Sequence, residues 1–585
     1  MEYQFFIYLI FLFGVNVSCQ EHQSDETEDF ERKKGAPVDG IRIAWDYSSM
    51  QKLSPRGDRT LPWTGYPRIR RLQNGSLLAV YEAEGNVELI RSEDNGSTWT
   101  APELLFEKHQ VSSPDEESAV VHKANGELIQ LANGDVVAAC NYRPQQNGIA
   151  PFSIAVKRSH DNGQTWNDPE VIYEAGKDFG DGCWEPAFLQ LPSGELQVYF
   201  ANENPYRTSD EQEISMLASE DNGVTWSEEH TTVSFREDRR DGMPVPLLVG
   251  EEVLVSIEDN GLDQFKPWIV RNPVDDLWSS PVRGTSSLRE YALVKDLSPD
   301  VYAGAPYLMK VPSGEVILSY QTNEDRSSNW ELSTLEVAIG DSTGRNFSKY
   351  THPFDVPLDS EAKWNSISKW DETTIVAAST TSFRSQACEV WMVLGHIIPE
   401  MKAEKKTVSV DGRIDADEWG RELPVFVGHK GSVNARANVR RDDEHLFVGV
   451  RVKYDDKDSS RDVPDDDEVS IFLDAGDFNL TRPDSGLYRF SWTPGGGPDV
   501  SAGEKGTWQR MEKKQIQLEA RELADENGYA LEWAIPFSDI DYETGDDVRF
   551  NLKLQYQNGE DEQIKENIVH ATEDASHTWC RISMD

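Results

Sequence analysis

The feature that most constrains this chain is an octamer, Ser-x-Asp-Asn-Gly-x-Thr-Trp, that occurs three times. The copies span Ser92–Trp99, Ser159–Trp166 and Ser219–Trp226, and their Asp residues are 67 and 60 residues apart. A weaker fourth copy, Asp341–Phe347, carries an extra residue and has Phe in place of Trp. Repetition at this spacing predicts a repeat architecture in which each octamer marks one structural unit.

The chemistry of the octamer is that of a hairpin turn. Asp and Asn cap backbone N–H groups, Gly takes the positive φ of a tight turn, and Trp packs between neighbouring sheets. The octamers resemble the Asp boxes of sialidase-type propellers. Short alternating strand phrases precede or follow them: Gly75–Tyr81, Gly134–Ala139, Gly194–Phe200 and Gly314–Tyr320. We therefore expect an all-β chain with a six-bladed sialidase-type β-propeller between about Pro62 and Gly395, because radial closure of blades protects strand edges.

The texture changes after Gly395. A charged stretch, Glu400–Lys406, indicates a linker. Three phrases after it resemble, in this order, a family 9 carbohydrate-binding module or its close sandwich relatives: Val410–Trp419, Asp465–Asp474 and Tyr529–Phe537. The resemblance implies a β-sandwich, and the alternation of His445–Val452 independently favours one.

The N-terminus predicts export. Its apolar run, Phe5–Val15, is too short to span a bilayer. Small residues before Cys19, followed by a polar acidic tract, resemble a bacterial lipoprotein signal in which Cys19 is lipidated, although the first four residues lack Lys and Arg. The alternative is an ordinary cleaved signal peptide. We expect a cell-surface or periplasmic bacterial lipoprotein, or otherwise a secreted protein.

The predicted organisation follows from these features. It is a signal peptide over 1–19, a flexible acidic tether over 20–40, a propeller with an added strand from Ile41 to Tyr47 over 41–397, a linker over 398–406 and a sandwich over 407–585. A chain of 585 residues exceeds what one core usually serves, so at least two domains are expected.

Charge and cysteine usage narrow the partners. The net charge of -47 opposes binding to nucleic acid or anionic lipid, so a polysaccharide or oligosaccharide is the expected partner of a monomer, with membrane contact only through Cys19. The other four cysteines, Cys140, Cys183, Cys388 and Cys580, lack metal-site spacing and predict buried free thiols. No metal and no cofactor are expected.

Two carboxylates have the surroundings that glycosidic cleavage requires, because that reaction uses a pair of them across the scissile bond. Glu185 is flanked by Trp and Pro at the start of a blade, and Glu258 ends the apolar strand Val253–Ile257. Burial at such positions raises a carboxyl pKa toward the range of acid–base work. From the residues alone, Glu185 could instead cap a loop and Glu258 could begin a solvated hairpin.

A longer resemblance supports the catalytic interpretation. Six phrases are similar, in order, to glycoside hydrolase family 93, and the likeness covers roughly Leu61 to Gly395: Tyr66–Leu72, Trp184–Pro186, Tyr199–Glu203, Arg240–Val245, Ile257–Glu258 and Ala305–Leu308. That family comprises retaining exo-1,5-α-L-arabinanases that release arabinobiose from the non-reducing end. The resemblance implies that Glu185 is the nucleophile and Glu258 the acid/base, without a metal. Retention requires carboxyl groups about 5–5.5 Å apart.

Further side chains are candidates for binding sugar. Arg68 lies where sialidase-fold enzymes place an arginine, where it would bind sugar hydroxyls, orient a catalytic Glu or form a structural salt bridge. The other cleft candidates are Tyr66, Arg143, Asp241, Tyr307 and Gln321. In the sandwich, Trp492 and Trp508 could form a sugar platform or belong to the core. Asp465–Glu468 could bind calcium or form a solvated loop.

Two rival functions stay open. An exo-sialidase on this fold would need a Tyr–Glu nucleophile pair and three convergent arginines, for which Arg68, Arg143 and Arg384 are available. A non-catalytic glycan-binding surface lipoprotein would use the propeller as a lectin. The lectin hypothesis predicts that Glu185 and Glu258 are not paired across a cleft.

Overall fold

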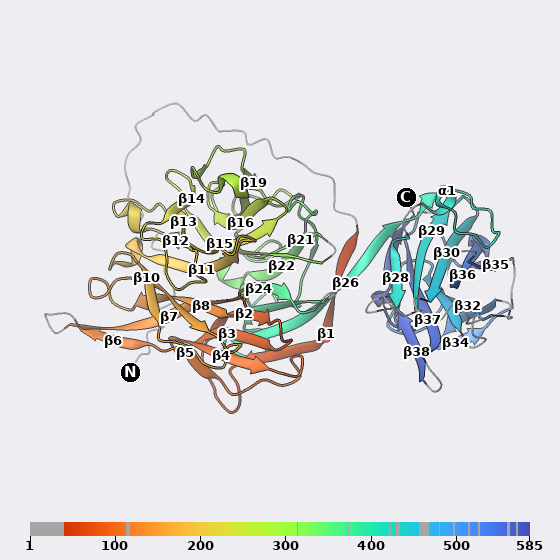
Figure 1. Ribbon diagram of the computed structural model, residues 1–585, viewed down its shortest axis with the longest axis horizontal. Coiled ribbons are helices and arrows are strands. Elements are labelled where there is room, and N and C mark those ends of the chain that lie inside the picture. Colours follow the sequence, from red (N-terminus) through yellow and green to blue (C-terminus); the bar gives the residue numbers. More distant parts are fainter. Residues whose placement is uncertain are drawn as a thin grey trace. The chain divides into compact units, whose positions relative to one another are not determined.

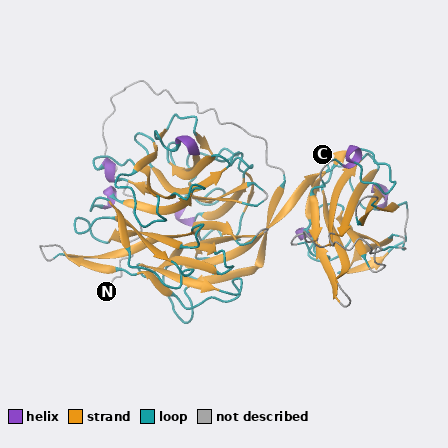
Figure 2. Cartoon of the chain, viewed as in Figure 1, coloured by secondary structure: helices purple, strands orange, loops and turns teal. Residues whose placement is uncertain are grey.

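The computed structural model describes most of the chain from residue 40 onward. The described residues are 40–112, 117–312, 314–371, 374–420, 423–428, 433–454, 467–478, 480–494, 496, 498–512, 515–523, 527–543, 545–558, 562–568 and 571–584. These residues are nearly all β, as Figures 1 and 2 show. Among them, no helix combines the length and apolar character that crossing a membrane would take. Cys19 and the rest of the predicted signal and most of the tether lie outside this part of the chain.

Six sheets form the blades of a propeller, which confirms the predicted architecture. The first blade contains β2 (Thr64–Arg71), β3 (Leu77–Ala83), β4 (Asn86–Ser92) and β5 (Glu103–Phe106), and the second contains β6 (His109–Ser112), β7 (Ser118–Gln130), β8 (Val136–Pro144), β9 (Ser153–Ser159) and β10 (Glu170–Glu174). The third contains β11 (Cys183–Gln190), β12 (Leu196–Asn202), β13 (Glu213–Ser219), β14 (Thr231–Phe235) and β18 (Val282–Arg283). The fourth contains β15 (Asp241–Val249), β16 (Glu252–Asp259), β17 (Lys266–Pro273) and β19 (Arg289–Tyr291). The fifth and sixth are β20 (Ala303–Lys310), β21 (Val316–Thr322), β22 (Thr334–Ile339) and β23 (Ser348–Thr351); β24 (Ala362–Lys369), β25 (Thr374–Thr381), β26 (Glu389–Lys402) and β1 (Ile41–Ser54).

The ring is closed by the first strand of the described residues. β1 pairs antiparallel with β26, with Ile41 opposite Pro399, so the last blade takes its outer strand from before the first blade, as the sequence predicts. The innermost strands contact one another in a complete circle, in the order β2, β7, β11, β15, β20, β24 and again β2. Each of these six strands therefore contacts the innermost strands of both neighbouring blades.

The Asp boxes form the turns that their chemistry predicts, and they lie between β4 and β5, between β9 and β10, and between β13 and β14. In the first box, Asp94 accepts hydrogen bonds from Ser92 Oγ (2.9 Å), Thr98 N (2.8 Å) and Thr98 Oγ1 (2.6 Å). Asn95 and Gly96 have φ of 56° and 80°. The same bonds recur around Asp161 and Asp221. Trp99 is buried in the core between the first and sixth blades.

The C-terminal domain is the predicted β-sandwich. One sheet contains β27 (Glu404–Lys405), β28 (Val425–Gly428), β29 (Val433–Arg441), β30 (His445–Tyr454), β35 (Gln517–Glu522) and β36 (Gly528–Pro536). The other contains β31 (Glu468–Asp474), β32 (Leu487–Trp492), β33 (Asp499–Glu504), β34 (Thr507–Arg510), β37 (Val548–Asn558), β38 (Glu562–Asn567) and β39 (Cys580–Ser583). Most of the stretch predicted as a linker, 398–406, is extended, because β26 continues to Lys402 and β27 follows.

Short helices complete the described fold. They are α1 (Ala416–Trp419) and the 3-10 turns Phe179–Asp181, Asn204–Tyr206, Val274–Asp276, Trp330–Leu332, Phe537–Asp539 and Ser576–Thr578. The four cysteines within the described residues are free thiols: Cys140, Cys183 and Cys580 are buried, as predicted, and Cys388 is half-buried.

One buried carboxylate explains why two distant phrases of the sandwich occur together. Glu532 Oε1 accepts a hydrogen bond from Trp419 Nε1 (2.7 Å). Its Oε2 accepts bonds from the backbone N–H groups of Asp411 and Gly412, each at 2.7 Å. The side chain thus satisfies the turn that begins the domain, and buried polar groups need such partners.

The box hydrogen bonds can be tested by stability measurements. Asp221→Ala removes three of them and should lower the Tm of the propeller by about 2–4 °C. Glu220→Ala, at the neighbouring exposed position, is the matched control and should leave Tm nearly unchanged. Thermal unfolding followed by calorimetry compares the two, and equal shifts would contradict a structural role for the Asp221 bonds.

Candidate active site

Six β-bulges surround the propeller axis, one in each innermost strand. In each, the pairing register shifts past two residues, and the first of the two has a positive φ. These first residues are Tyr66 (54°), Asn125 (53°), Glu185 (53°), Met243 (49°), Ala305 (49°) and Trp364 (54°). Left-handed backbone is costly for residues other than Gly, so its repetition in six blades shows that the architecture imposes it.

Glu185 is the one acidic residue among these six bulge residues. Its neighbour Pro186 lacks an N–H and therefore fits a bulge, where the ladder needs no donor. The preceding Trp184 is buried and donates from Nε1 to Glu203 Oε2 (3.1 Å). The backbone N–H of Met243, the bulge residue of the next blade, acts on the Glu185 carboxyl group and lowers its pKa.

Glu258 approaches from that next blade. It lies in β16 opposite Gly242, and its Oε2 accepts a hydrogen bond from the N–H of Ala305 (2.8 Å). A Cβ at Gly304 would lie 2.4 Å from this oxygen and 2.4 Å from the hydroxyl of Tyr302, so only glycine leaves room for both groups. The carboxyl is therefore held in a fixed place by backbone from the fifth blade.

The negative charge of Glu258 opposes ionisation of Glu185. Burial raises the pKa of Glu185 to about 8, and the negative charge of Glu258 is the next largest cause. Burial raises the pKa of Glu258 to about 7, against the Ala305 hydrogen bond and the positive charge of Arg240, which lower it. Both carboxyl groups therefore ionise at a much higher pH than an exposed glutamate does.

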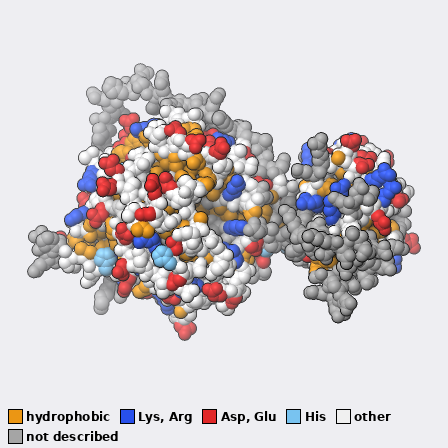
Figure 3. Space-filling view, viewed as in Figure 1, with side chains coloured by type: hydrophobic (Ala, Val, Ile, Leu, Met, Phe, Trp, Pro, Cys, Tyr) orange, Lys and Arg blue, Asp and Glu red, His pale blue; other side chains and the backbone are white. Residues whose placement is uncertain are grey.

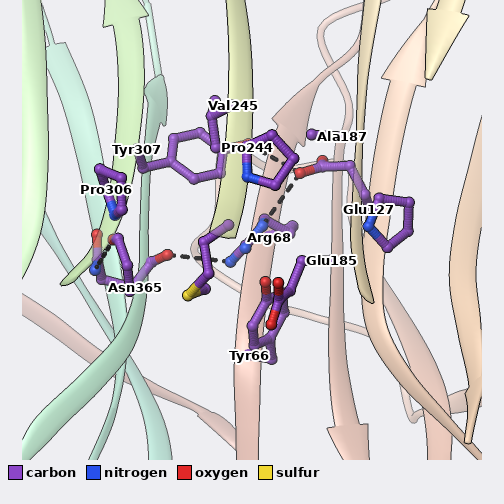
Figure 4. A pocket seen from close by; sticks show the side chains of 13 residues that line it. Tyr66, Arg68, Glu127, Glu185, Ala187, Pro244, Val245, Pro306, Tyr307 and Asn365 are labelled. Atoms are coloured by element: carbon purple, nitrogen blue, oxygen red, sulfur yellow. Dashed lines mark hydrogen bonds and ion pairs between the residues drawn. The ribbon is translucent and has the colours of Figure 1, made fainter. Parts of the chain in front are cut away.

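A small cavity at the axis gathers several of the predicted residues, as Figure 4 shows. Its lining includes Tyr66, Arg68, Glu185 and Tyr307, and Glu258 lies beside it through Ala305, which is also in the lining. The full set is Tyr66, Arg68, Glu127, Glu185, Pro186, Ala187, Met243, Pro244, Val245, Ala305, Pro306, Tyr307 and Asn365. The structure thus brings together four of the predicted site residues and places a fifth next to them.

Arg68 is held by a buried ion pair. Its Nε lies 3.1 Å from Glu127 Oε2, and one of its terminal nitrogens donates to Pro67 O (2.8 Å) and Asn365 O (3.1 Å). Its guanidinium stacks over Tyr66, 4.2 Å from the ring centroid. The structural salt bridge that the sequence left open for Arg68 is therefore present, and it fixes the floor of the cavity.

Three other predicted binding residues are placed differently. Asp241 is fully buried and paired with Arg289 at 2.6 Å, away from the cavity lining. Gln321 is also buried, where it donates to Tyr302 Oη (2.8 Å) and accepts from Trp364 N (2.7 Å). Arg143 lies over the rings of Phe179 and Trp184, and Glu185 raises its pKa against a larger lowering by burial.

Sequence reasoning missed other polar groups near the pair. The phenol of Tyr302 has its pKa raised by burial and then by Glu258. Glu203 accepts the hydrogen bond of Trp184 and also forms an ion pair with Arg240, the cation that lowers the pKa of Glu258. The signal for Glu203 and Arg240 was present, because both lie in the phrases that carry the family resemblance.

Glu82 is a third carboxyl group in the same environment. Burial raises its pKa to about 7, and its Oε1 accepts a hydrogen bond from Asn125 N (2.6 Å). Among the described residues, no group of three or more His, Cys, Asp or Glu side chains is arranged to hold a metal ion.

The residues predicted to bind sugar or calcium in the sandwich have different surroundings. Trp492 is buried in the core, 5.2 Å from the ring centroid of Tyr529, so the core interpretation holds for it. Trp508 is half-buried and donates to Asp574 (2.9 Å). Asp465 and Asp466 lie outside the described residues, whereas Asp467 bonds Tyr454 and Glu468 pairs with Lys553. Over the face seen in Figure 3, acidic side chains are widely distributed.

Comparison with known proteins gives matches in both parts of the chain. Residues 145–254 match a BNR repeat-like domain, and residues 410–583 match a carbohydrate family 9 binding domain-like model. A search of curated proteins finds no match. The chain therefore combines a BNR-repeat propeller with a family 9-like carbohydrate-binding domain, as its sequence predicts.

Solved structures with similarity fall into the same two groups. One is the GH93 α-L-arabinofuranosidase of Fusarium graminearum with arabinobiose, at 16% identity, covering 60% of this chain and 97% of that one, with a TM-score of 0.43. Another is the Penicillium chrysogenum α-L-arabinanase with arabinobiose, at 17% identity, covering 62% of this chain and 98% of that one, with a TM-score of 0.43. A family 9 module of Caldicellulosiruptor kristjanssonii with glucose is 17% identical, covering 32% of this chain and 95% of that one, with a TM-score of 0.24.

The coupling of the two carboxyl groups gives a direct prediction. In Glu258→Gln the pKa of Glu185 should fall, because the negative charge that opposes its ionisation is gone. Carbon NMR of glutamate-labelled protein, with Glu185→Gln to assign the signal, measures the titration. Glu82→Gln is the matched control and should shift the pKa of Glu185 less. If the Glu185 titration is unchanged in Glu258→Gln, the two groups do not form a pair.

Proposed function

We propose that this protein is a retaining exo-glycoside hydrolase that acts on 1,5-α-L-arabinan, or a related plant or algal glycan, from the non-reducing end. The observation that carries the proposal is the electrostatic pairing of Glu185 and Glu258 from adjacent blades beside the axial cavity. The match of residues 410–583 to a carbohydrate-binding domain supports a glycan as the ligand. The family 93 resemblance supports arabinan and supplies the roles of the two residues.

The proposed chemistry uses both carboxyl groups twice. The Glu185 carboxylate attacks the anomeric carbon, the glycosidic C–O bond breaks, and its electron pair leaves with the oxygen, which takes the proton of Glu258. The Glu258 carboxylate then removes a proton from water, whose oxygen attacks the same carbon and releases Glu185. Two inversions give net retention. The first step needs the charge on Glu185 and the proton on Glu258, which is the reverse of the order in which burial raises their pKa values, to about 8 and about 7, so binding of substrate has to move the proton to Glu258.

A sialidase is less well supported. A sialidase binds the carboxylate of its substrate through several convergent guanidinium groups. Arg68 is paired with Glu127, and Arg384 is exposed beside Met50 and Phe383 rather than in the cavity lining. The negative charge of Glu185 does contribute to the raised pKa of Tyr66, as expected for a Tyr–Glu pair. A sialyl reporter substrate therefore belongs in the assay.

Hydrolysis of linear arabinan is the decisive assay. We expect the purified protein to release arabinobiose as the first product, with the α-anomer retained in proton NMR spectra recorded during the reaction. Glu185→Gln should reduce kcat by at least about 10³-fold, because the nucleophile is lost. Binding without hydrolysis by the wild type would support the lectin alternative, and release of sialic acid would support the sialidase.

Glu258→Gln separates the two roles. With an aryl arabinofuranoside whose leaving group needs no proton, this variant should keep the first step, whereas its activity on arabinan should be lost. Added azide should then restore turnover, because an anion can displace Glu185 without a general base. Equal loss on both substrates would remove Glu258 from the acid/base role.

We also propose that Cys19 is the lipidated first residue of an exported protein, on the strength of the short apolar run and the acidic tract around it. Expressed in a bacterium with a lipoprotein pathway, the wild type should incorporate labelled palmitate and partition with membranes. Cys19→Ser should abolish the label. Label-free, secreted wild-type protein would indicate an ordinary cleaved signal peptide instead.

A further inference from the structure

A second ring of positions lies next to the bulges. In each blade, the residue that precedes the bulge is paired across the ladder with one residue of the second strand. These six second-strand residues are Glu82, Asn141, Ala201, Glu258, Gln321 and Thr380. We call them the capping positions, because of what four of them do.

Four capping positions bind the bulge of the following blade. Glu82 Oε1 accepts from Asn125 N (2.6 Å), and Glu258 Oε2 accepts from Ala305 N (2.8 Å). Gln321 Oε1 accepts from Trp364 N (2.7 Å). Thr380 Oγ1 accepts from Tyr66 N (3.1 Å), which carries the pattern from the last blade to the first. Side chains of different length therefore satisfy the same backbone N–H, one at each of four blade junctions.

The two exceptions flank the blade that carries Glu185. At the junction before it, the amide of Asn141 is buried and neither its nitrogen nor its oxygen has a hydrogen-bond partner. At the junction after it, the capping position is Ala201, which has no acceptor to offer the N–H of Met243. That N–H instead acts on the carboxyl group of Glu185, whose pKa it lowers, and both residues line the same cavity.

We propose that Ala201 is a positioning residue, because its missing acceptor leaves the Met243 N–H to hold the Glu185 carboxylate beside Glu258. The inference rests on the proposed function only in taking Glu185 as the nucleophile. A donor aimed at a carboxylate favours its charged form, which a nucleophile needs and which burial opposes. The Met243 bond does act in that direction, since it lowers the pKa of Glu185.

The blade geometry supplies the substitution that tests this. Ala201→Thr places a hydroxyl where Thr380 has one, and Thr380 Oγ1 reaches the equivalent N–H. Ala201→Val has nearly the same shape and no acceptor, so it reports the cost of filling the site alone. Ala201→Ser offers the hydroxyl with less bulk and replaces the Thr variant should that variant not fold, which thermal unfolding establishes.

The expected difference is in the pH profile. Once the introduced hydroxyl captures the Met243 N–H, the Glu185 anion loses a donor, its pKa rises by about one unit, and the acidic limb of kcat/KM moves to higher pH. We expect kcat at a pH below that limb to fall by about tenfold, with KM little changed. The Val variant should keep the wild-type limb. Identical limbs in the Thr and Val variants would overturn the proposal.

A readout without turnover keeps this test separate from the proposed function. The Glu185 titration, followed by carbon NMR as above, should move to higher pH in Ala201→Thr and stay in place in Ala201→Val. If arabinan is not cleaved but this shift is seen, the positioning role stands and the substrate assignment fails. If arabinan is cleaved and Glu185 titrates alike in all three proteins, the positioning role fails alone.

Discussion

The backbone N–H groups at the six axial bulges are the constraint on which the site depends. A bulge removes a residue from the strand ladder, and an N–H left there must find another acceptor. In four junctions the acceptor is a side chain from the preceding blade, so the blades are joined in pairs at the point where they converge. Glu258 is one of these joints.

Glu258 therefore combines a structural and a chemical property. The Ala305 N–H fixes one carboxylate oxygen, and Gly304 leaves the space that the group occupies. Both this hydrogen bond and Arg240 favour the anion, but burial outweighs them and the pKa rises to about 7. A carboxyl group that is rigidly placed and poised near neutrality is what acid–base work requires, and here the fold provides it without a separate supporting loop.

The parts of the structure that depend on local chemistry could be predicted from the sequence. The Asp boxes specify their own turns, since Asp94, Asn95 and Gly96 form the bonds and φ angles that their residue types favour. In the sandwich, the phrases that contain Trp419 and Glu532 predicted one domain, and their side chains are bonded to each other. Glu185 was identifiable because Trp184 and Pro186 mark a buried bulge.

The parts that depend on register could not be predicted. Glu258 and Asp259 are adjacent acidic residues, yet their side chains point to opposite faces of β16. Glu258 faces Gly242 and Ala305, whereas Asp259 joins Asp241 and Arg289 in a buried cluster. The sequence phrase around Asp241 suggested the cleft, but the alternation of the strand places that carboxylate in the cluster. Gln321 also caps the backbone N–H of Trp364, a contact that appears only once the blades are aligned.

The register also explains why, in a nearly symmetric ring, Glu258 raises the pKa of Glu185. Glu82 and Glu258 occupy equivalent capping positions, each bonded to the next bulge and each with a pKa raised to about 7 by burial. What differs is the neighbouring charge: Arg68 acts on Glu82, and Arg240 acts on Glu258. Of these two carboxyl groups, Glu258 is the one whose charge raises the pKa of Glu185. The asymmetry thus originates in the third blade. The bulge residue of that blade is the acidic Glu185, and its capping position is Ala201, which leaves the Met243 N–H to act on Glu185.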